Sequence, residues 1–317
     1  MAEKKQRFVF GPVASRRLGR SLGIDLVPFK TCSYDCVYCQ LGRTTCRTAQ
    51  RAEYAPPAEV LGQLEAALAA GPPPDVITLA GSGEPTLHSG LREILAGIKR
   101  LTDLPLVVLT NGSLLFLPEV RDALQSADVV APDLDAGSET AWRAVCRPAD
   151  GLSFARVVDG LQTFAREYRG RLEYEVFLVD GLYDLEAEVG KIAALLSGLP
   201  GQVRLNTTAR PTAEVAAGMV AVERLAQFAL RFDPPAGLIP ELKLGDSSSR
   251  PQGRAGADEV ADLVSRHPAT LPEIASALGL SAARAEELVA ELLAAGRIAS
   301  RRHQGRTFFE GAKPIGD

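Results

Sequence analysis

The sequence lacks the apolar segments that would place the chain in a membrane or export it. Residues 1–7 are mostly polar and have no apolar run of a signal peptide. No stretch approaches the roughly 20 consecutive apolar residues that a membrane-spanning helix needs. We therefore expect a cytoplasmic protein with no membrane partner.

The sequence also lacks a strong excess of either charge. The formal net charge of −4 gives no sign of a strongly basic nucleic-acid binder, although it leaves a local basic patch open. A content of 46% hydrophobic and 23% charged residues is typical of a globular protein, and 317 residues suit one large domain or two. Histidine is scarce, with 3 residues, which suits chemistry that does not rely on a histidine base.

The cysteines do not form the pattern of a disulfide framework. There are 5 of them, an odd number, and Cys32, Cys36 and Cys39 lie within one stretch of eight residues. In a reducing compartment such a cluster more often binds metal. Cys46 and Cys146 remain, and two cysteines are too few for a second cluster, so we interpret them as buried or incidental thiols.

A sharper alternative concerns Cys146. Arg143 and Arg147 flank it in the sequence, and their charges would lower its pKa. A thiol activated in this way would suit a redox role or a covalent link to substrate.

Residues 8–233 alternate between short β-rich runs and amphipathic helical runs. We predict strands at residues 23–27, 75–79, 106–109, 128–130, 174–179 and 202–205, and helices at residues 58–70, 90–100, 119–126, 154–168 and 184–197. Repeated β-then-α order predicts an α/β fold with a parallel sheet and helices outside it. Six units suit a partial (β/α)6 barrel, with its chemistry at the carboxyl ends of the strands.

The chain changes character after this core domain, residues 1–233. Residues 234–256 are rich in proline, serine and glycine, which predicts a linker. Residues 257–317 then predict helices at 258–267, 271–278 and 281–295, followed by a hairpin that turns at Gln304-Gly305. Three helices and a hairpin are the pattern of a winged helix-turn-helix domain.

The cysteine stretch has the spacing Cys-x3-Cys-x2-Cys. A four-iron cubane cluster normally takes one thiolate per iron, so three thiolates leave one iron open for another ligand. A structural zinc site is the alternative, but it usually has four ligands in paired spacings. No fourth ligand is evident beside Cys32, Cys36 and Cys39, since Cys46 lies beyond a turn that contains glycine.

The pattern Cys-x3-Cys-x-aromatic-Cys resembles the signature of the radical S-adenosylmethionine (SAM) superfamily, with Tyr38 at the aromatic position. Residues 10–23 and 39–42 resemble a poorly characterised subgroup related to tRNA-wyosine synthases. The resemblance covers residues 8–233. It implies a [4Fe-4S] cluster on the three cysteines, SAM on the open iron with its adenine by Tyr38, and an electron donor such as flavodoxin or ferredoxin.

A second motif follows the predicted strand at residues 75–79. The resemblance implies that Gly83 and Glu84, with Pro85, receive the SAM ammonium group, and that Ser82 stands where the family has a glycine. The residues themselves favour the same use, because glycine lets a ligand approach the backbone and a carboxylate suits an ammonium. Without the cysteines upstream, an ordinary Gly-Pro turn is the better interpretation.

Polar residues at later strand ends are candidates for the SAM ribose and carboxylate, as the resemblance implies. They are Asn111, Asp133, Asp135 and Ser138. Ordinary turn and cap chemistry is an equal alternative for each of them. Asn206 and Arg210 face SAM or substrate in a weaker hypothesis, and His88 either reaches the active site or begins a surface helix.

The expected function is reductive cleavage of SAM to a 5′-deoxyadenosyl radical, which abstracts hydrogen from a substrate. An RNA nucleoside is one substrate hypothesis, and a peptide or small molecule docked by the winged helix is the second. A non-catalytic iron–sulfur regulator that binds DNA is the third.

The terminal domain offers mixed support for nucleic-acid binding. Its third helix carries more acidic than basic residues, which disfavours phosphate contact. Its hairpin is basic, with Arg297, Arg301, Arg302, His303 and Arg306.

Overall fold

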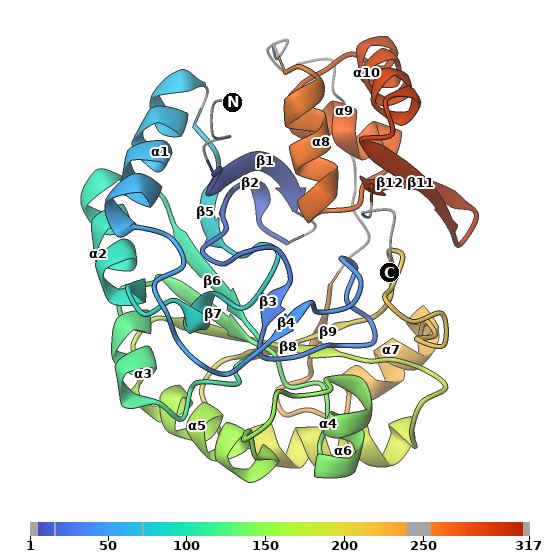
Figure 1. Cartoon of the computed structure of the whole chain (residues 1–317). Coiled ribbons are helices and arrows are strands. Elements are labelled where there is room, and N and C mark those ends of the chain that lie inside the picture. The colour runs from blue at the N-terminus through green and yellow to red at the C-terminus, as the bar shows by residue number, and fades with distance from the viewer. Residues whose placement is uncertain (1–5, 16, 72, 240–254, 313–317) are drawn as a thin grey trace.

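The computed structural model describes residues 6–15, 17–71, 73–239 and 255–312. Its centre is an eight-stranded sheet in the order β1-β2-β5-β6-β7-β8-β9-β10, which follows the order of the chain (Figure 1). The strands are β1 (Val9–Ser15), β2 (Gly19–Ile24), β5 (Val76–Leu79), β6 (Leu106–Thr110), β7 (Val129–Pro132), β8 (Arg171–Phe177), β9 (Gln202–Asn206) and β10 (Gly237–Leu238). β1 is antiparallel to β2, and each later neighbour pair is parallel.

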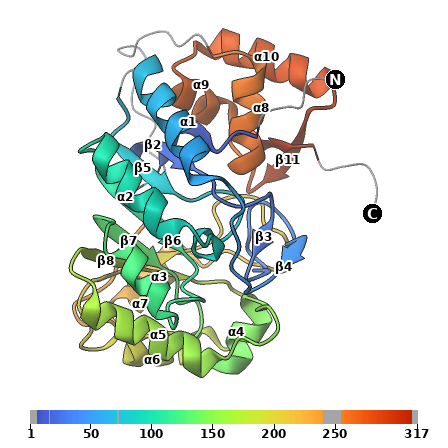
Figure 2. The same ribbon diagram turned by 60° about the vertical axis from the view of Figure 1, so that its left-hand side comes forward.

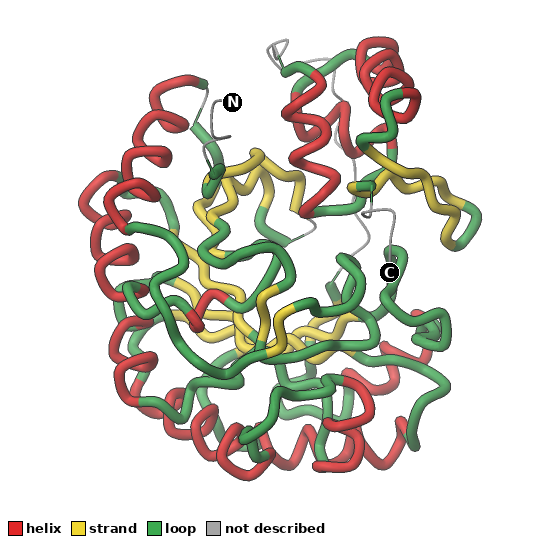
Figure 3. Tube along the Cα trace, viewed as in Figure 1, coloured by secondary structure: helices red, strands yellow, loops and turns green. Residues whose placement is uncertain are grey.

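Helices lie on the outside of this curved sheet (Figure 3). They are α1 (Pro57–Ala70), the short η1 (Pro85–Leu87), α2 (Leu91–Leu101), α3 (Pro118–Leu124), α4 (Glu139–Val145), α5 (Phe154–Glu167), α6 (Leu185–Leu196) and α7 (Val222–Ala229). In α2 the buried residues recur at helical spacing, at Leu91, Ile94, Leu95 and Ile98, so one apolar face packs on the sheet.

The inside of the sheet is closed at the amino ends of its strands. Val76, Val107 and Val129 form a small apolar cluster there, and Leu18 and Leu109 pack against it. The opposite edge, where the strands end, carries the cysteine loop with β3 (Thr31–Cys32) and β4 (Cys46–Arg47). The sheet is therefore a partial barrel with a closed floor.

The predicted partial (β/α)6 architecture is confirmed, with differences at both edges of the sheet. Several elements were not predicted: β1, β3, β4, β10, η1, α4 and α7. The strands predicted at residues 23–27 and 174–179 lie a few residues later than β2 and β8. β1 contains Gly11-Pro12 and its pairing with β2 shifts register between Phe10 and Val13, so it lacks a clean strand pattern.

The segment expected as a linker, residues 234–256, is only partly described. β10 lies inside it and pairs with β9, so the sheet extends past residue 233. Residues 240–254 lie outside the described part of the chain.

Residues 255–312 form a compact unit that we call the C-terminal module. It contains α8 (Ala257–Arg266), α9 (Leu271–Leu278), α10 (Ala282–Ala294) and the hairpin β11 (Ile298–His303) and β12 (Arg306–Gly311). These are the three helices and the hairpin that the sequence predicts. Val260, Ile274, Leu288 and Leu292 are fully or almost fully buried in a core of its own.

The C-terminal module packs against the barrel at two places. α8 and α9 lie against β1, and Val13 of β1 reaches the module core. Figure 2 shows α8, α9 and α10 at the top of the molecule, above β3 and β4. On the other side, Gln304 donates a hydrogen bond to the Thr208 carbonyl in the loop after β9, at 3.0 Å. The module therefore bridges the two ends of the open sheet.

A buried ion pair fastens the second contact. The Arg210 guanidinium donates to both carboxylate oxygens of Glu273 in α9, at 3.1 and 3.2 Å. Burial alone would raise the pKa of the Glu273 carboxyl, but Arg210 and the amide of Thr270 outweigh it and hold the pKa below its usual range. The pair links the barrel to the first turn of α9.

Replacing Glu273 with Gln tests this contact. The change leaves Arg210 buried without its counter-charge, which costs about 3 kcal/mol or roughly a hundredfold in local opening. Hydrogen–deuterium exchange should speed up by that factor in α9 and stay unchanged in β6.

Glu287→Gln is the matched control, because the Arg284–Glu287 pair is exposed, with side chains 52% and 67% accessible. Its effect should stay below about 1 kcal/mol. Equal exchange in the two variants would contradict the role assigned to Glu273.

Candidate functional site

The cysteine loop follows β2 and lies over the carboxyl ends of the strands. Its backbone is fixed by the chain around α4. The amides of Asp35 and Val37 donate to the carbonyls of Cys146 and Val145, both at 2.9 Å, and the Ala149 amide donates to the Ser33 carbonyl at 2.8 Å. The loop is thus preorganised by the fold.

Cys32, Cys36 and Cys39 are all free and partly exposed on this loop. Two of their sulfur atoms accept contacts from the protein. Lys30 Nζ lies 3.0 Å from Cys39 Sγ, while Asn111 Nδ2 and the Tyr34 amide each lie 3.5 Å from Cys32 Sγ. Such donors stabilise thiolates, and hydrogen bonds to sulfur set the potential of iron–sulfur clusters.

The electrostatics of the loop also suit a bound cationic group. Burial, followed by the charges of Glu84 and Cys36, raises the pKa of the Cys32 thiol. A thiolate there therefore requires positive charge nearby, which iron supplies. Within the described ranges, no three His, Cys, Asp or Glu side chains converge on the position of a single metal ion. The thiolates of a cubane bind different irons and have no need to converge.

Glu84 is buried at the end of β5 and joins it to the end of β6. Its carboxylate accepts hydrogen bonds from the Thr86 amide and hydroxyl at 3.0 and 2.6 Å, the Thr110 hydroxyl at 2.6 Å and the Asn111 amide at 2.8 Å. Burial raises the pKa of Glu84 and these donors oppose the rise. The carboxylate expected to receive the SAM ammonium group therefore also holds the ends of β5 and β6 in position.

Gly83 lies directly against the cysteine loop. A Cβ atom at this position would come 1.9 Å from the Thr31 carbonyl oxygen, so no side chain fits without moving the backbone. The glycine of the second motif therefore has a structural cause, since it lets the end of β5 touch the loop that carries the cysteines.

Ser82, the departure from the family motif, contacts a residue that the sequence analysis missed. Its hydroxyl and amide donate to Asp25 Oδ2 at 2.6 and 3.2 Å. Arg266 Nε of α8 lies 3.3 Å from the same oxygen. Burial raises the pKa of Asp25, and the contacts with Ser82 and Arg266 oppose the rise.

These contacts connect the C-terminal module to the cysteine loop. The Ser82 carbonyl accepts from the Lys30 amide at 2.9 Å, and Lys30 in turn contacts Cys39. Lys30 and Asp25 gave no sequence signal, because Asp25 lies within a predicted strand and Lys30 in an ordinary loop. The sequence feature that marked this contact was Ser82, a serine where the family has a glycine.

The predicted residues Tyr38 and Asp135 meet at the rim. The Tyr38 hydroxyl donates to Asp135, and the Phe177 amide donates to the other carboxylate oxygen at 2.8 Å. The Tyr38 ring stacks on Phe177 with centroids 4.0 Å apart and planes at 10°. Burial raises the pKa of Asp135 to about 7, against the effect of these donors.

Asn111 and Asp133 lie at the same rim. Asn111 Nδ2 donates to the Ser33 hydroxyl at 2.9 Å, next to its contact with Cys32. Asp133 pairs by a backbone bridge with Glu175, and burial followed by the charges of Asp135 and Glu175 raises its pKa. The structure thus brings Tyr38, Asn111, Asp133 and Asp135 to the loop, and their contacts with SAM stay predictions.

Ser138 lies apart from this group. Its hydroxyl accepts from the Ala141 amide as the N-cap of α4 and donates to Glu188 of α6 at 2.8 Å. His88 is likewise used within the protein, since its ring contacts the backbone of Ala55 and Gly90. These hydrogen bonds give both side chains a structural role among the described residues.

The expectation that neighbouring arginines lower the pKa of Cys146 is wrong. Arg143 pairs with Glu139, and Arg147 pairs with Glu214. Cys146 is buried, its Sγ lies 3.9 Å from Asp135 Oδ2, and its interaction with Cys36 and its burial raise its pKa. Cys46, by contrast, is exposed.

A cavity of about 370 Å³ lies beneath the loop, inside the barrel. Tyr38 and Cys39 line it from the loop, and Thr78, Leu109 and Glu175 line it from the strands. Asn206 and Arg210, the weaker sequence candidates, also face it, as do Arg266 and His267 of the module. The space is bounded by the cysteine loop, the barrel interior and α8.

Comparison with known proteins identifies the family. The sequence profile described as "Radical SAM superfamily" matches residues 26–195, which is more than half of the chain. The chain belongs to the radical SAM superfamily. This confirms the resemblance seen in Cys32, Cys36 and Cys39. Proteins of this superfamily are enzymes that use SAM and a [4Fe-4S] cluster, so these are the cofactors of this chain.

Several curated relatives are similar over most of the chain. A UPF0026 protein of Helicobacter pylori (strain 26695) is 34% identical over 278 residues, which cover 86% of this chain and 88% of that protein. A protein named GTPase Obg from Brachyspira hyodysenteriae is 35% identical over 93% of this chain but only 44% of its own length. A UPF0026 protein of Methanocaldococcus jannaschii is 36% identical, with 65% of this chain and 64% of that protein covered. The chain thus spans less than two thirds of the latter two relatives.

Among solved structures, a radical SAM methyltransferase from Sphaerobacter thermophilus aligns with a TM-score of 0.48 and 22% identity, over 69% of this chain and 65% of that one. The likeness is too distant to carry an argument about activity.

No helix among the described residues is long and apolar enough to cross a membrane.

Lys30 provides a test of the cluster environment. Replacing it with Met removes a cation 3.0 Å from Cys39 Sγ, which makes it harder to add an electron to the cluster. A charged hydrogen bond of about 2 kcal/mol corresponds to a midpoint potential roughly 80 mV more negative.

A redox titration followed by electron paramagnetic resonance measures this shift. Lys99→Met is the matched control, because Lys99 pairs with Asp128 on the outer surface, and it should leave the potential unchanged. A Lys30 variant with the potential of the unaltered protein would refute the contact.

Proposed function

We propose that this chain is a radical enzyme that acts on a small polar molecule bound in the barrel cavity. Cys32, Cys36 and Cys39 hold the cluster. When bound, the cluster supplies the electron that cleaves SAM into methionine and a 5′-deoxyadenosyl radical. The substrate would lose a hydrogen atom from one of its carbons, and 5′-deoxyadenosine would be the other product.

The observation that carries the proposal is the position of the cavity. It begins at Cys39 and Tyr38 and continues down the barrel to the apolar floor at Leu18. A ligand beneath the loop is shielded on several sides by the strands and by α8, which limits the access of water to a reactive radical. The residues of this chain bind, orient and shield, while the cofactors supply the reactivity.

Tyr38, Asp135 and Phe177 have a positioning role in this proposal. The stacked rings of Tyr38 and Phe177 and the bonds to Asp135 form a rigid wall beside the loop. Asn111 links the end of β6 to Cys32 and Ser33. Gly83 and Glu84 place the backbone of β5 for the SAM ammonium, with Asp133 at the same rim.

We also propose that residues 257–317 are a winged helix-turn-helix domain used here as a wall of the cavity. Its third helix, α10, carries Glu286, Glu287 and Glu291, which repel phosphate. In its hairpin, Arg297 pairs with Asp258 and Arg306 lies near Glu273. This arrangement disfavours the DNA-binding regulator.

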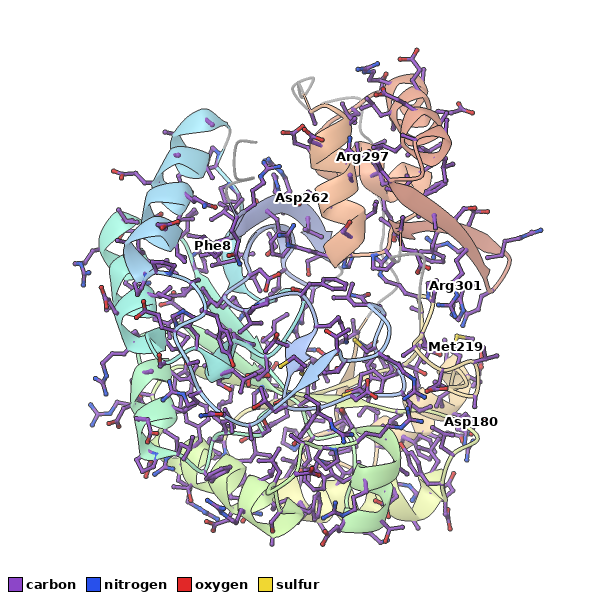
Figure 4. The ribbon with its side chains drawn as sticks, in the orientation of Figure 1. Phe8, Asp180, Met219, Asp262, Arg297 and Arg301 are labelled. Atoms are coloured by element: carbon purple, nitrogen blue, oxygen red, sulfur yellow. The ribbon has the colours of Figure 1, made fainter. Side chains whose placement is uncertain are left out.

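One observation favours an RNA nucleoside as the second candidate substrate. Arg301 and Arg302 of β11 form no ion pair with any described residue, and Figure 4 places Arg301 on the hairpin above Met219 of the loop after β9. Two free cations beside the barrel are suited to a phosphate backbone. With either substrate, a flavodoxin or ferredoxin is the proposed electron donor to the cluster.

The ligand assignment is tested by Cys36→Ala. Anaerobically reconstituted protein is given SAM and dithionite, and 5′-deoxyadenosine is measured by mass spectrometry together with iron and sulfide. The variant should lose the cluster and all product, because each thiolate binds its own iron.

Cys46→Ala is the matched control, since Cys46 is an exposed cysteine outside the triplet, and it should keep both cluster and product. Retention of the cluster in the Cys36 variant, or no product from the unaltered chain, refutes the proposal.

The two substrate classes are separated by RNA analysis. Bulk RNA from a strain that lacks the gene is compared with that of the parent by nucleoside mass spectrometry. We expect identical modified-nucleoside profiles, because the cavity is walled by α8 and has a volume of about 370 Å³. A nucleoside that disappears in the deletion strain and returns on complementation would favour RNA instead.

A further inference from the structure

The charges that face the cavity are unequal in sign. Arg17, Arg210 and Arg266 line it, and among the described lining residues Glu175 is the only carboxylate. The acidic partners of two arginines lie behind them. Glu273 binds Arg210, and Asp25 and Asp262 bind Arg266, yet none of these three carboxylates lines the cavity. These carboxylates hold the guanidinium groups in place, and the guanidinium groups face the cavity.

Of these three arginines, Arg17 has the most unused hydrogen-bonding capacity. It enters the barrel from the turn between β1 and β2, and its side chain is 14% exposed. Its Nη1 donates to Glu175 Oε2 at 3.2 Å, and its Nε lies 4.0 Å from Glu173, beyond hydrogen-bond distance. A guanidinium has five N–H groups, so most of them have no acceptor among the described residues.

Both carboxylate oxygens of Glu175 already accept a hydrogen bond from within the protein. One of its oxygens accepts from Arg17 and the other accepts from Asn206 Nδ2 at 2.7 Å. Both oxygens are therefore engaged from the side of the barrel. The N–H groups of Arg17 that have no acceptor within the described ranges remain available in this part of the cavity, and such donors call for an acceptor-rich, negatively charged group.

We propose that the cavity binds the oxyanion group, a carboxylate or a phosphate, of a small substrate, with Arg17 as its principal ligand. Arg210 and Arg266 present the cationic side of their ion pairs to the cavity, from the loop after β9 and from α8. Arginine is the side chain best suited to carboxylates and phosphates, because its planar fork binds two oxygens at once. This inference rests on the proposed function and names the substrate class of the same cavity.

The remaining lining suits the carbon skeleton of such a substrate. Phe10, Leu109 and Ile239 contribute apolar surface to the cavity. Hydrogen abstraction requires a C–H bond close to the cofactors, and Cys39 lines the same space as Arg17. An acid anchored at Arg17 therefore presents its carbon chain within the space that the cysteine loop closes. A volume of about 370 Å³ is within the range of small-molecule sites.

The test is binding of three probes to the anaerobically reconstituted full chain, with SAM present so that its own carboxylate occupies its site. The probes are glutarate and glycerol 3-phosphate, which carry the two oxyanions, and glutaramide, the neutral amide analogue of glutarate. Isothermal titration calorimetry should give at least one oxyanion an affinity at least tenfold above that of glutaramide. Arg17→Gln should weaken that binding by about tenfold or more, the loss expected for a charged hydrogen bond.

Arg20→Gln is the matched control, because Arg20 lies on the same hairpin but contacts the Pro73 carbonyl and does not line the cavity. It should bind the probe as the unaltered chain does. Arg17→Lys keeps the charge beside Glu175 and loses the fork, so it should fold normally and bind with an intermediate affinity.

Three results would overturn the inference: no binding of either oxyanion, equal binding of glutaramide, or unchanged binding in Arg17→Gln. A loss of SAM affinity in Arg17→Gln as large as the loss of probe affinity would also overturn it, because Arg17 would then hold the carboxylate of SAM. The titrations need no reductant. A chain that cleaves SAM but binds no probe refutes this inference alone, and a chain that binds probe but never cleaves SAM refutes the proposed function.

Discussion

The site depends on one buried carboxylate whose hydrogen bonds cross between strands. Glu84 is removed from water, so its negative charge requires donors from the protein. Thr86, Thr110 and Asn111 supply them, and two of these residues belong to the next strand end. The hydrogen bonds to this carboxylate therefore fix the end of β5 against the end of β6.

The effect continues from Asn111 to the cysteines. Its amide hydrogen bonds to Glu84, while its side chain contacts Ser33 and Cys32 on the loop. Gly83 allows the same strand end to touch the Thr31 carbonyl. The cysteine loop is thus held from below by strand ends and from the side by the chain around α4. Rigid support of this kind is what a site for a reactive radical requires.

The residues with repeating or local chemistry were predictable from the sequence. The alternation of strands and helices predicted the partial barrel. The spacing of Cys32, Cys36 and Cys39 predicted the cysteine loop, and Gly83-Glu84 predicted the strand end beside it. These signals are local, because turn glycines, cysteine spacing and hydrophobic period are read within a few residues. Tyr38 and Asp135 were found separately, and only the fold brings them into contact.

The rest depends on contacts between residues far apart in the chain. Asp25, Lys30 and Arg17 are ordinary residues in sequence, and each gains its role from a partner that the fold supplies. Ser138 and His88 bond within the protein as well, which the sequence did not show, and their expected roles at the site stay predictions. The pKa of Cys146 was misjudged for the same reason, because the fold turns the flanking arginines to other acids and buries the thiol.

The contact between Arg266 and Asp25 spans 241 positions of the chain. Because the cavity takes one wall from α8, it is not complete until most of the polypeptide has been made. During synthesis the barrel and its cysteines precede the module that covers them. The cysteine loop is therefore synthesised before the helix that completes this wall of the cavity.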